Sequence, residues 1–251
     1  PAVPTVAKSI GNIIENEGYT EVAYVIEDGA WGHEFGAGVE AYWPDDINLT
    51  TATAPIPETD FVPYLRQFPD NVEVICGTAH PAGVTSMYPQ IQELGMDLEL
   101  YTAAITAMEV DFGAVGDAIG NSFVSFNSPD LYSDKFAEVA TAYADATGNL
   151  FDTAQANGYV SVDLIAKAAA SAGAVDAQEI SAALHDGTYS SLYANDISYT
   201  AWGEVDGSVN IYNGFDVNSA PDYYPDAPFA PTEFYRTEPL APFEPGSLGL
   251  Q

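Results

Sequence analysis

The three histidines are the residues best suited to acid–base catalysis or metal binding, and their neighbours decide whether such a site can form. His33, His80 and His185 lie far apart in the sequence. A nucleophile, histidine and carboxylate arrangement would have to be assembled from distant segments without a local motif. His33-Glu34 is followed by Phe-Gly-Ala-Gly, so it lacks the second histidine of a zinc-binding helix. We therefore expect no catalytic residue, no metal site and no cofactor, and we do not expect an enzyme.

Four closely spaced glycines raise the question of phosphate binding. They are Gly29, Gly32, Gly36 and Gly38. Their spacing does not match the GxGxxG pattern, and acidic residues surround them. Phosphates bind where the local potential is positive, so nucleotide binding is not favoured here.

Paired acidic residues could hold cations through their carboxylate oxygens. Glu27-Asp28 and Asp45-Asp46 are two such pairs, and a solvated acidic surface is the favoured interpretation of each. Asn48-Leu-Thr50 matches the N-linked glycosylation sequon in a polar stretch that we expect to be an exposed loop. Asn48 is therefore a candidate glycosylation site, which is compatible with an extracellular chain.

Alternating strands and helices must position these side chains. Val6, Ile10, Ile13 and Ile14 repeat at helical spacing, and an apolar run typical of a buried strand follows at residues 22–26. The alternation continues with a helix around Val39, a strand at 72–76, a helix at 84–94, a strand near 98–103, a short helix near 112–118 and a strand at 122–126. This pattern predicts a parallel α/β sheet covered on both faces.

The second half of the chain has a different character. From Asn127 it reads as helices at about 131–147, 151–171 and 177–185, with too few strands to cover. A hairpin is predicted around Glu204 to Gly207. The proline-rich segment from Pro221 to Gln251 is expected to run as an extended arm rather than form regular structure.

The charge balance limits the partners of this chain. Its 251 residues include Asp+Glu 37 against Lys+Arg 5, which gives a net charge of -32. Nucleic acids and anionic membranes would be repelled. Because 47% of the residues are hydrophobic, the chain can still build a core. We interpret the composition as that of a halophilic protein, and an acidic protein with a cationic partner is the alternative.

The single cysteine and the start of the chain give less information. Cys76 lies in the apolar run 72–76, so we expect a buried structural thiol and no internal disulfide. No secretory leader and no apolar run long enough to span a bilayer is found in the sequence. We therefore expect a soluble chain, or one whose export and anchoring segments lie outside this sequence.

Five motifs occur in a specific order along the chain. They are Glu27-Asp-Gly-Ala-Trp-Gly32 after the first strand, Thr59-Asp-Phe61, Gly77-Thr-Ala-His-Pro81 after the second strand, Gln92-Glu-Leu-Gly95, and Asn157-Gly-Tyr159 at the start of a helix that ends in Ala172-Gly-Ala. Together they resemble type I periplasmic solute-binding proteins. The resemblance is to the branched-chain amino acid and amide group of ABC importers, and it extends to about Phe215.

The resemblance implies two doubly wound α/β lobes, with the first lobe incomplete. Residues 1–126 correspond to the second lobe and residues 127–196 to the returning, helical part of the first lobe. Residues 197–220 correspond to the final crossing and strands of the second lobe, and 221–251 form the proline-rich arm. The early part of the first lobe has no counterpart, so helices 131–185 are expected to expose apolar faces.

The resemblance also implies a ligand cleft between the lobes, at the carboxyl ends of strands. Trp31-Gly32 matches the aromatic residue and glycine that line the cleft, and His80 matches a contact before the proline. A tryptophan face suits an apolar or cationic group, and His80 could donate to a ligand oxygen. Thr102 and Thr106 offer hydroxyls in place of the usual acid, and Tyr159 fits a tyrosine that more often packs than binds.

We therefore expect an extracellular solute-binding protein of an ABC importer that delivers a small polar ligand to a membrane permease. It would be exported and lipid-anchored through a segment not in this sequence. The alternative is a repurposed structural subunit of an extracellular assembly. In that case self-assembly, rather than a missing N-terminal segment, would complete the first lobe.

The salt dependence of stability tests the halophile interpretation. Carboxylates repel one another in dilute buffer, and the Debye length falls to about 3 Å at 1 M salt. We expect the melting temperature to rise steeply between about 0.1 M and about 3 M KCl. Thermal unfolding followed by circular dichroism measures it, and an unchanged melting temperature would contradict the interpretation.

Overall fold

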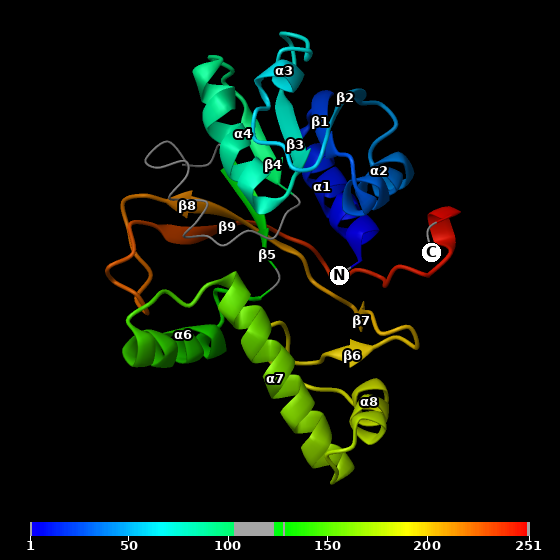
Figure 1. Cartoon of the computed structure of the whole chain (residues 1–251), viewed down its shortest axis with the longest axis vertical. Helices are drawn as coiled ribbons and strands as arrows, with labels where there is room; N and C mark the ends of the chain where they lie inside the picture. Colours follow the sequence, from blue (N-terminus) through cyan, green and yellow to red (C-terminus); the bar gives the residue numbers. More distant parts are fainter. Residues whose placement is uncertain (1, 103–122, 128, 250–251) are drawn as a thin grey trace.

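The computed structural model describes residues 2–102, 123–127 and 129–249. Within them the main sheet has seven strands, in the order β2-β1-β3-β4-β5-β8-β9. β1 to β5 are parallel, whereas β8 and β9 are antiparallel additions at one edge (Figure 1). The strands are Glu21–Glu27 (β1), Asn48–Ala54 (β2), Val74–Thr78 (β3), Glu99–Thr102 (β4), Phe123–Asn127 (β5), Ile211–Asp216 (β8) and Ala230–Arg236 (β9).

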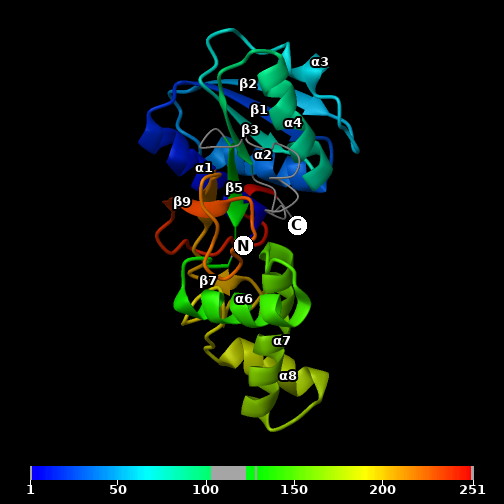
Figure 2. The same ribbon diagram turned by 90° about the vertical axis from the view of Figure 1, so that its left-hand side faces the viewer.

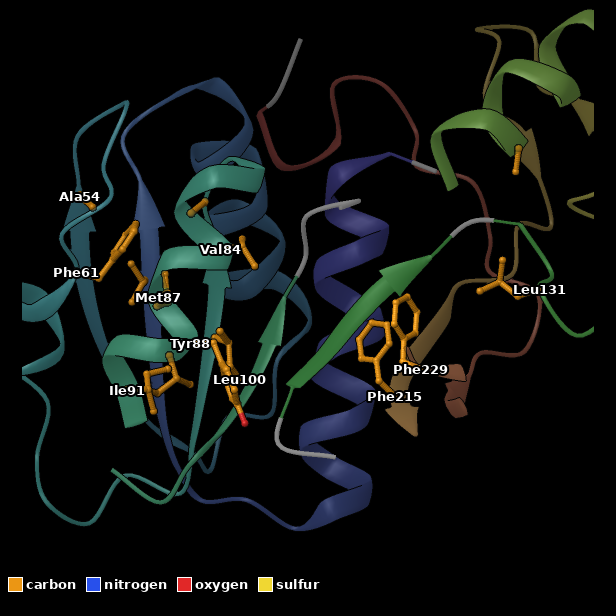
Figure 3. Close-up of a cluster of buried hydrophobic side chains, with 14 of the residues drawn as sticks. Ala54, Phe61, Val84, Met87, Tyr88, Ile91, Leu100, Leu131, Phe215 and Phe229 are labelled. Carbon is orange, nitrogen blue, oxygen red and sulfur yellow. The ribbon is translucent and has the colours of Figure 1, made fainter. Parts of the chain in front are cut away.

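Helices cover both faces of this sheet, as the sequence pattern predicted. On one face α1 (Val3–Glu17) and α2 (Ala30–Tyr42) enclose a cluster that includes Tyr24, Phe35 and Tyr101. On the other face lie the short α3 (Val62–Leu65) and α4 (Pro81–Glu93). The face under α4 holds a second cluster, in which Val84, Met87, Tyr88 and Ile91 of the helix lie near Leu100 of β4 (Figure 3).

Burial on both sides explains why the central strands are almost continuously apolar. In β1 Val22 and Tyr24 belong to the cluster under α1, while Ala23 and Val25 belong to the cluster under α4. All five residues of β3 are buried, Cys76 among them. The Cys76 thiol is free, and its burial raises its pKa, as expected of a structural thiol.

The helical part lies beyond the carboxyl end of β5, apart from the helices that cover the sheet (Figures 1 and 2). It consists of α6 (Asp134–Thr147), α7 (Thr153–Ala172) and α8 (Ala177–Asp186), followed by a hairpin of β6 (Ser198–Tyr199) and β7 (Val205–Asp206). Each helix begins at a side-chain cap, provided by Ser133, Asp152 and Asp176. The bounds agree with the predicted helices to within a few residues.

Two segments differ from the sequence predictions. The stretch around Asn48, expected to be a loop, is strand β2, which pairs with β1 along its whole length. The proline-rich segment is not simply an extended arm, because Ala230–Arg236 forms β9 against β8. Pro231 is tolerated there because β9 is an edge strand. A 3₁₀ turn, η3 (Ser247–Gly249), lies near the end of the chain.

Some predictions cannot be compared with the structure. The short helix expected near 112–118 lies outside the described residues.

None of the described helices has the length and apolar character needed to cross a membrane.

The contact between α1 and α2 depends on a glycine. A Cβ atom at Gly38 would lie 2.7 Å from Cβ of Ala7 and 2.9 Å from Cα of Pro4, so the two helices touch through backbone. A Cβ atom at Gly36, on the same helix, would meet no atom of a neighbouring element within 4 Å. The two glycines therefore make a matched pair for mutation.

Gly38→Ala should destabilise the protein by about 1–3 kcal/mol because α1 and α2 must move apart. Gly36→Ala should instead stabilise it by up to about 1 kcal/mol, since alanine is the better helix former. Urea unfolding in molar salt measures both. Equal effects of the two substitutions would contradict the close helix contact.

Candidate functional site

The carboxyl ends of the parallel strands lie together at one edge of the sheet. Ile26 pairs with Thr78 and Gly77 pairs with Thr102, so β1, β3 and β4 end side by side. This is the edge from which β5 continues toward the helical part (Figures 1 and 2). Open α/β sheets bind ligands at this edge.

Glu27, the last residue of β1, connects the neighbouring elements. It is buried, with 4% of its surface exposed. One carboxylate oxygen, Oε2, accepts a hydrogen bond from the backbone N–H of His80 at 2.8 Å and also contacts Nδ1 of the His80 ring. His80 is the N-cap residue of α4. A carboxylate at a helix N-terminus is stabilised by the positive end of the helix dipole.

The first turn of α2 packs on the backbone of the same residue. A Cβ atom at Gly32 would lie 2.0 Å from the carbonyl oxygen of Glu27. Only glycine permits this approach. The carbonyl of Glu27 therefore supports α2, and its carboxylate supports α4.

The aromatic residue before this glycine is held in place by packing. The Trp31 ring stacks on Phe35, with centroids 5.8 Å apart and planes 18° apart. Phe35 is fully buried, whereas Trp31 is 36% exposed. The indole thus has a fixed orientation while much of its surface stays accessible.

The surroundings of this edge are acidic. Asp28 contacts Nε2 of His33 at 2.9 Å, with both side chains exposed. Backbone N–H groups of Asp60 and Thr59 lower the pKa of the exposed Glu58, which keeps this carboxyl ionised. No lysine or arginine occurs in the described loops at 28–29, 55–61 and 79–80.

The remaining predicted residues divide into separate groups. Thr102 ends β4 at the same edge, but it is fully buried, and its hydroxyl has no hydrogen-bond partner among the residues that the structure describes. Tyr159 belongs to the helical part, on α7, and is 38% exposed. Thr106 lies outside the described residues. Asn48 is exposed at the start of β2 and donates a hydrogen bond to Glu21.

Glu27 is the residue that the sequence interpretation missed. The pair Glu27-Asp28 was expected to be solvated surface, which is wrong for Glu27 because the end of β1 is covered by α2 and α4. An acidic residue that ends an apolar strand run and precedes a glycine turn was the available signal. Among the described residues, no group of three or more histidine, cysteine, aspartate or glutamate side chains could hold a metal ion.

The fold and this edge define a class of two-part α/β binding proteins. The chain belongs to the periplasmic binding protein family, whose model matches residues 4–215. No curated protein matches the chain.

Solved structures show the same fold at low sequence identity. One is a branched-chain amino acid ABC transporter ligand-binding protein from Burkholderia xenovorans, with 16% identity and a TM-score of 0.77, covering 94% of this chain and 63% of that one. A solute-binding protein from R. palustris in complex with benzoate has 13% identity and a TM-score of 0.77, with 96% and 65% covered.

A third similar structure is a branched-chain amino acid substrate-binding protein from Streptococcus pneumoniae in complex with isoleucine. It has 16% identity and a TM-score of 0.73, covering 90% of this chain and 64% of that one. The chain thus has the α/β fold of these two-lobed proteins, but it spans less than two thirds of their length.

Proposed function

We propose that this chain is the solute-binding component of an ABC importer. It would hold a small polar molecule, such as an amino acid, an amide or a related compound, between the sheet and the helical part. The observation that carries this proposal is the junction at Glu27, which brings Trp31-Gly32 and His80 to one edge of parallel strands. The family match over residues 4–215 supports it.

In this proposal, binding involves closure rather than covalent chemistry. The sheet part, residues 1–126 with 197–220, and the helical part, residues 127–196, act as the two bodies, and the crossings between them act as the hinge. The accessible face of Trp31 takes an apolar or cationic group of the ligand. The closed form docks on a membrane permease. The protein works outside a salt-adapted cell, anchored by lipid through a segment beyond this sequence.

The exposed apolar surface of α7 supports the proposal that further polypeptide completes the first lobe. One side of the helix is buried through Ala156, Val160, Leu164 and Ala168. The opposite side is also apolar and is exposed, with Val162 at 69% and Ile165 at 50%. The only charged residues in α7, Asp163 and Lys167, pair with each other between these sides. A surface helix normally has one apolar side, so a second exposed apolar side on α7 is consistent with a further covering partner.

The same exposed side of α7 is the observation that favours the alternative, a structural subunit that self-assembles. In molar salt we expect the 251-residue chain to associate through this surface as its concentration rises, because water is excluded from Val162 and Ile165. Ile165→Glu should return it to a monomer, and Thr141→Glu on the exposed side of α6 should not.

Sedimentation velocity distinguishes these cases. A chain that stays monomeric at high concentration would contradict the expected association. Large assemblies that form equally in the Ile165→Glu variant would show that another surface drives assembly.

The ligand proposal is tested by thermal unfolding with a panel of small molecules, including isoleucine, benzoate and benzamide. A ligand present at a hundred times its Kd stabilises a protein by about 2.7 kcal/mol. Trp31→Ala should abolish this stabilisation, since the variant loses the ring that contacts the ligand. The matched control is Trp202→Ala, which removes another exposed indole, 49% accessible and in the loop that joins β6 and β7.

The expected result is a shift in melting temperature for the wild type and for Trp202→Ala, and none for Trp31→Ala. A Trp31→Ala variant that is stabilised normally would remove Trp31 from the site.

A further inference from the structure

Two groups of His80 converge on one oxygen of Glu27. The backbone N–H of His80 donates to Oε2 at 2.8 Å, and Nδ1 of the ring contacts the same oxygen. The Glu27 side chain is only 6% exposed, whereas the His80 side chain is 60% exposed. The ring is therefore held by Glu27 at Nδ1, while much of the rest of the ring is exposed.

This contact decides where a neutral ring carries its hydrogen. A carboxylate oxygen can only accept hydrogen bonds, so the nitrogen that faces it must be the donor. That nitrogen is Nδ1. The exposed Nε2 then has a free lone pair and acts as an acceptor. Free histidine in water favours the opposite tautomer, with its hydrogen on Nε2.

We propose that Glu27 is a positioning residue that fixes the neutral His80 ring with its hydrogen on Nδ1, so that Nε2 accepts a hydrogen bond from an N–H or O–H group of the ligand. The ligand class is then an amide, an amine or a hydroxyl compound. The ligand part of this inference rests on the proposed function, whereas the tautomer rests on the contact itself.

The charges around the edge agree with a donor-bearing ligand. Asp28 lies in the loop after β1, and Glu58 and Asp60 lie in the loop after β2; neither loop contains lysine or arginine. A ligand recognised mainly through a carboxylate would find no permanent cation in these loops. A ligand that presents N–H or O–H groups could donate hydrogen bonds to these carboxylates.

Nitrogen NMR of the histidine rings tests the tautomer directly. The chain has three histidines, so His80→Phe identifies the His80 signals by their loss. Spectra are recorded in molar salt at a pH where the nitrogen shifts report neutral rings. We expect His80 to carry hydrogen on Nδ1. His33 should carry it on Nε2, because that nitrogen faces Asp28. A neutral His80 ring with its hydrogen on Nε2 would overturn the proposal.

Substitution then tests whether Glu27 is the cause. In Glu27→Leu the His80 ring should revert to mainly the Nε2–H form. The matched control Asp28→Asn should change the His33 signals and leave His80 unaltered. Retention of the Nδ1–H form in Glu27→Leu, with the other histidine signals unchanged, would overturn the role of Glu27. If Glu27→Leu does not fold, the wild-type spectrum still decides the tautomer.

A pair of probes tests the ligand class. Benzamide and benzoate have the same ring, but only benzamide has N–H donors. Benzamide should raise the melting temperature of the wild type more than benzoate does, and His80→Phe should cancel the difference. An equal or larger shift with benzoate would contradict an accepting Nε2. If no molecule of the panel shifts the melting temperature, the proposed function fails, while the NMR result still decides the tautomer.

Discussion

The arrangement of the candidate site depends on how two helices begin at one strand end. The backbone of Glu27 lies against Gly32 of α2, and its carboxylate lies against the N-cap residue of α4. A larger residue at position 32 would separate α2 from the sheet. A residue without an acceptor at position 27 would leave the N–H of His80 without a partner. The orientations of Trp31 and His80 both follow from this single junction.

Two of the chain's five lysine and arginine residues connect elements of the fold away from the candidate site. Arg236, at the end of β9, makes two hydrogen bonds to Asp130 in the crossing that precedes α6, and further ones to Glu233. These hydrogen bonds raise the pKa of Arg236. Lys167 joins Asp163 of α7 to the backbone of Ser190. The carboxylates left over form the acidic surface, which includes the edge around Glu27.

The sequence predicted the central elements well and the edges of the sheet poorly. β1 and β3 are apolar on both faces, and α6 and α7 carry clear caps, so local patterns were sufficient. In β2 only Ala52 and Ala54 are buried. β2 forms because it pairs with β1, and no local sequence pattern indicates this pairing. β9 likewise depends on pairing with β8 across a proline-rich segment.

The site was predicted in a similar way. The resemblance pointed to Trp31, Gly32 and His80, and each lies beside a strand end that the pattern located, while their role in binding stays a prediction. Glu27 was missed because its burial results from the first residues of α2 and of α4, which both pack on it, whereas its charge alone suggested a position in solvent. Thr102 was found as part of a strand, but its complete burial depends on packing that the sequence does not express.

The most direct measurement of the central claim is an NMR titration that follows the three indole N–H groups and the three histidine rings while a small-molecule ligand is added. The Trp43 indole is buried and donates to the backbone of Ala7, and Trp202 lies in the loop between β6 and β7. We predict that Trp31 and His80 shift together and that Trp43, Trp202 and His185 do not. Shifts confined to Trp202 or His185, with Trp31 and His80 unchanged, would contradict a ligand site at the Glu27 junction.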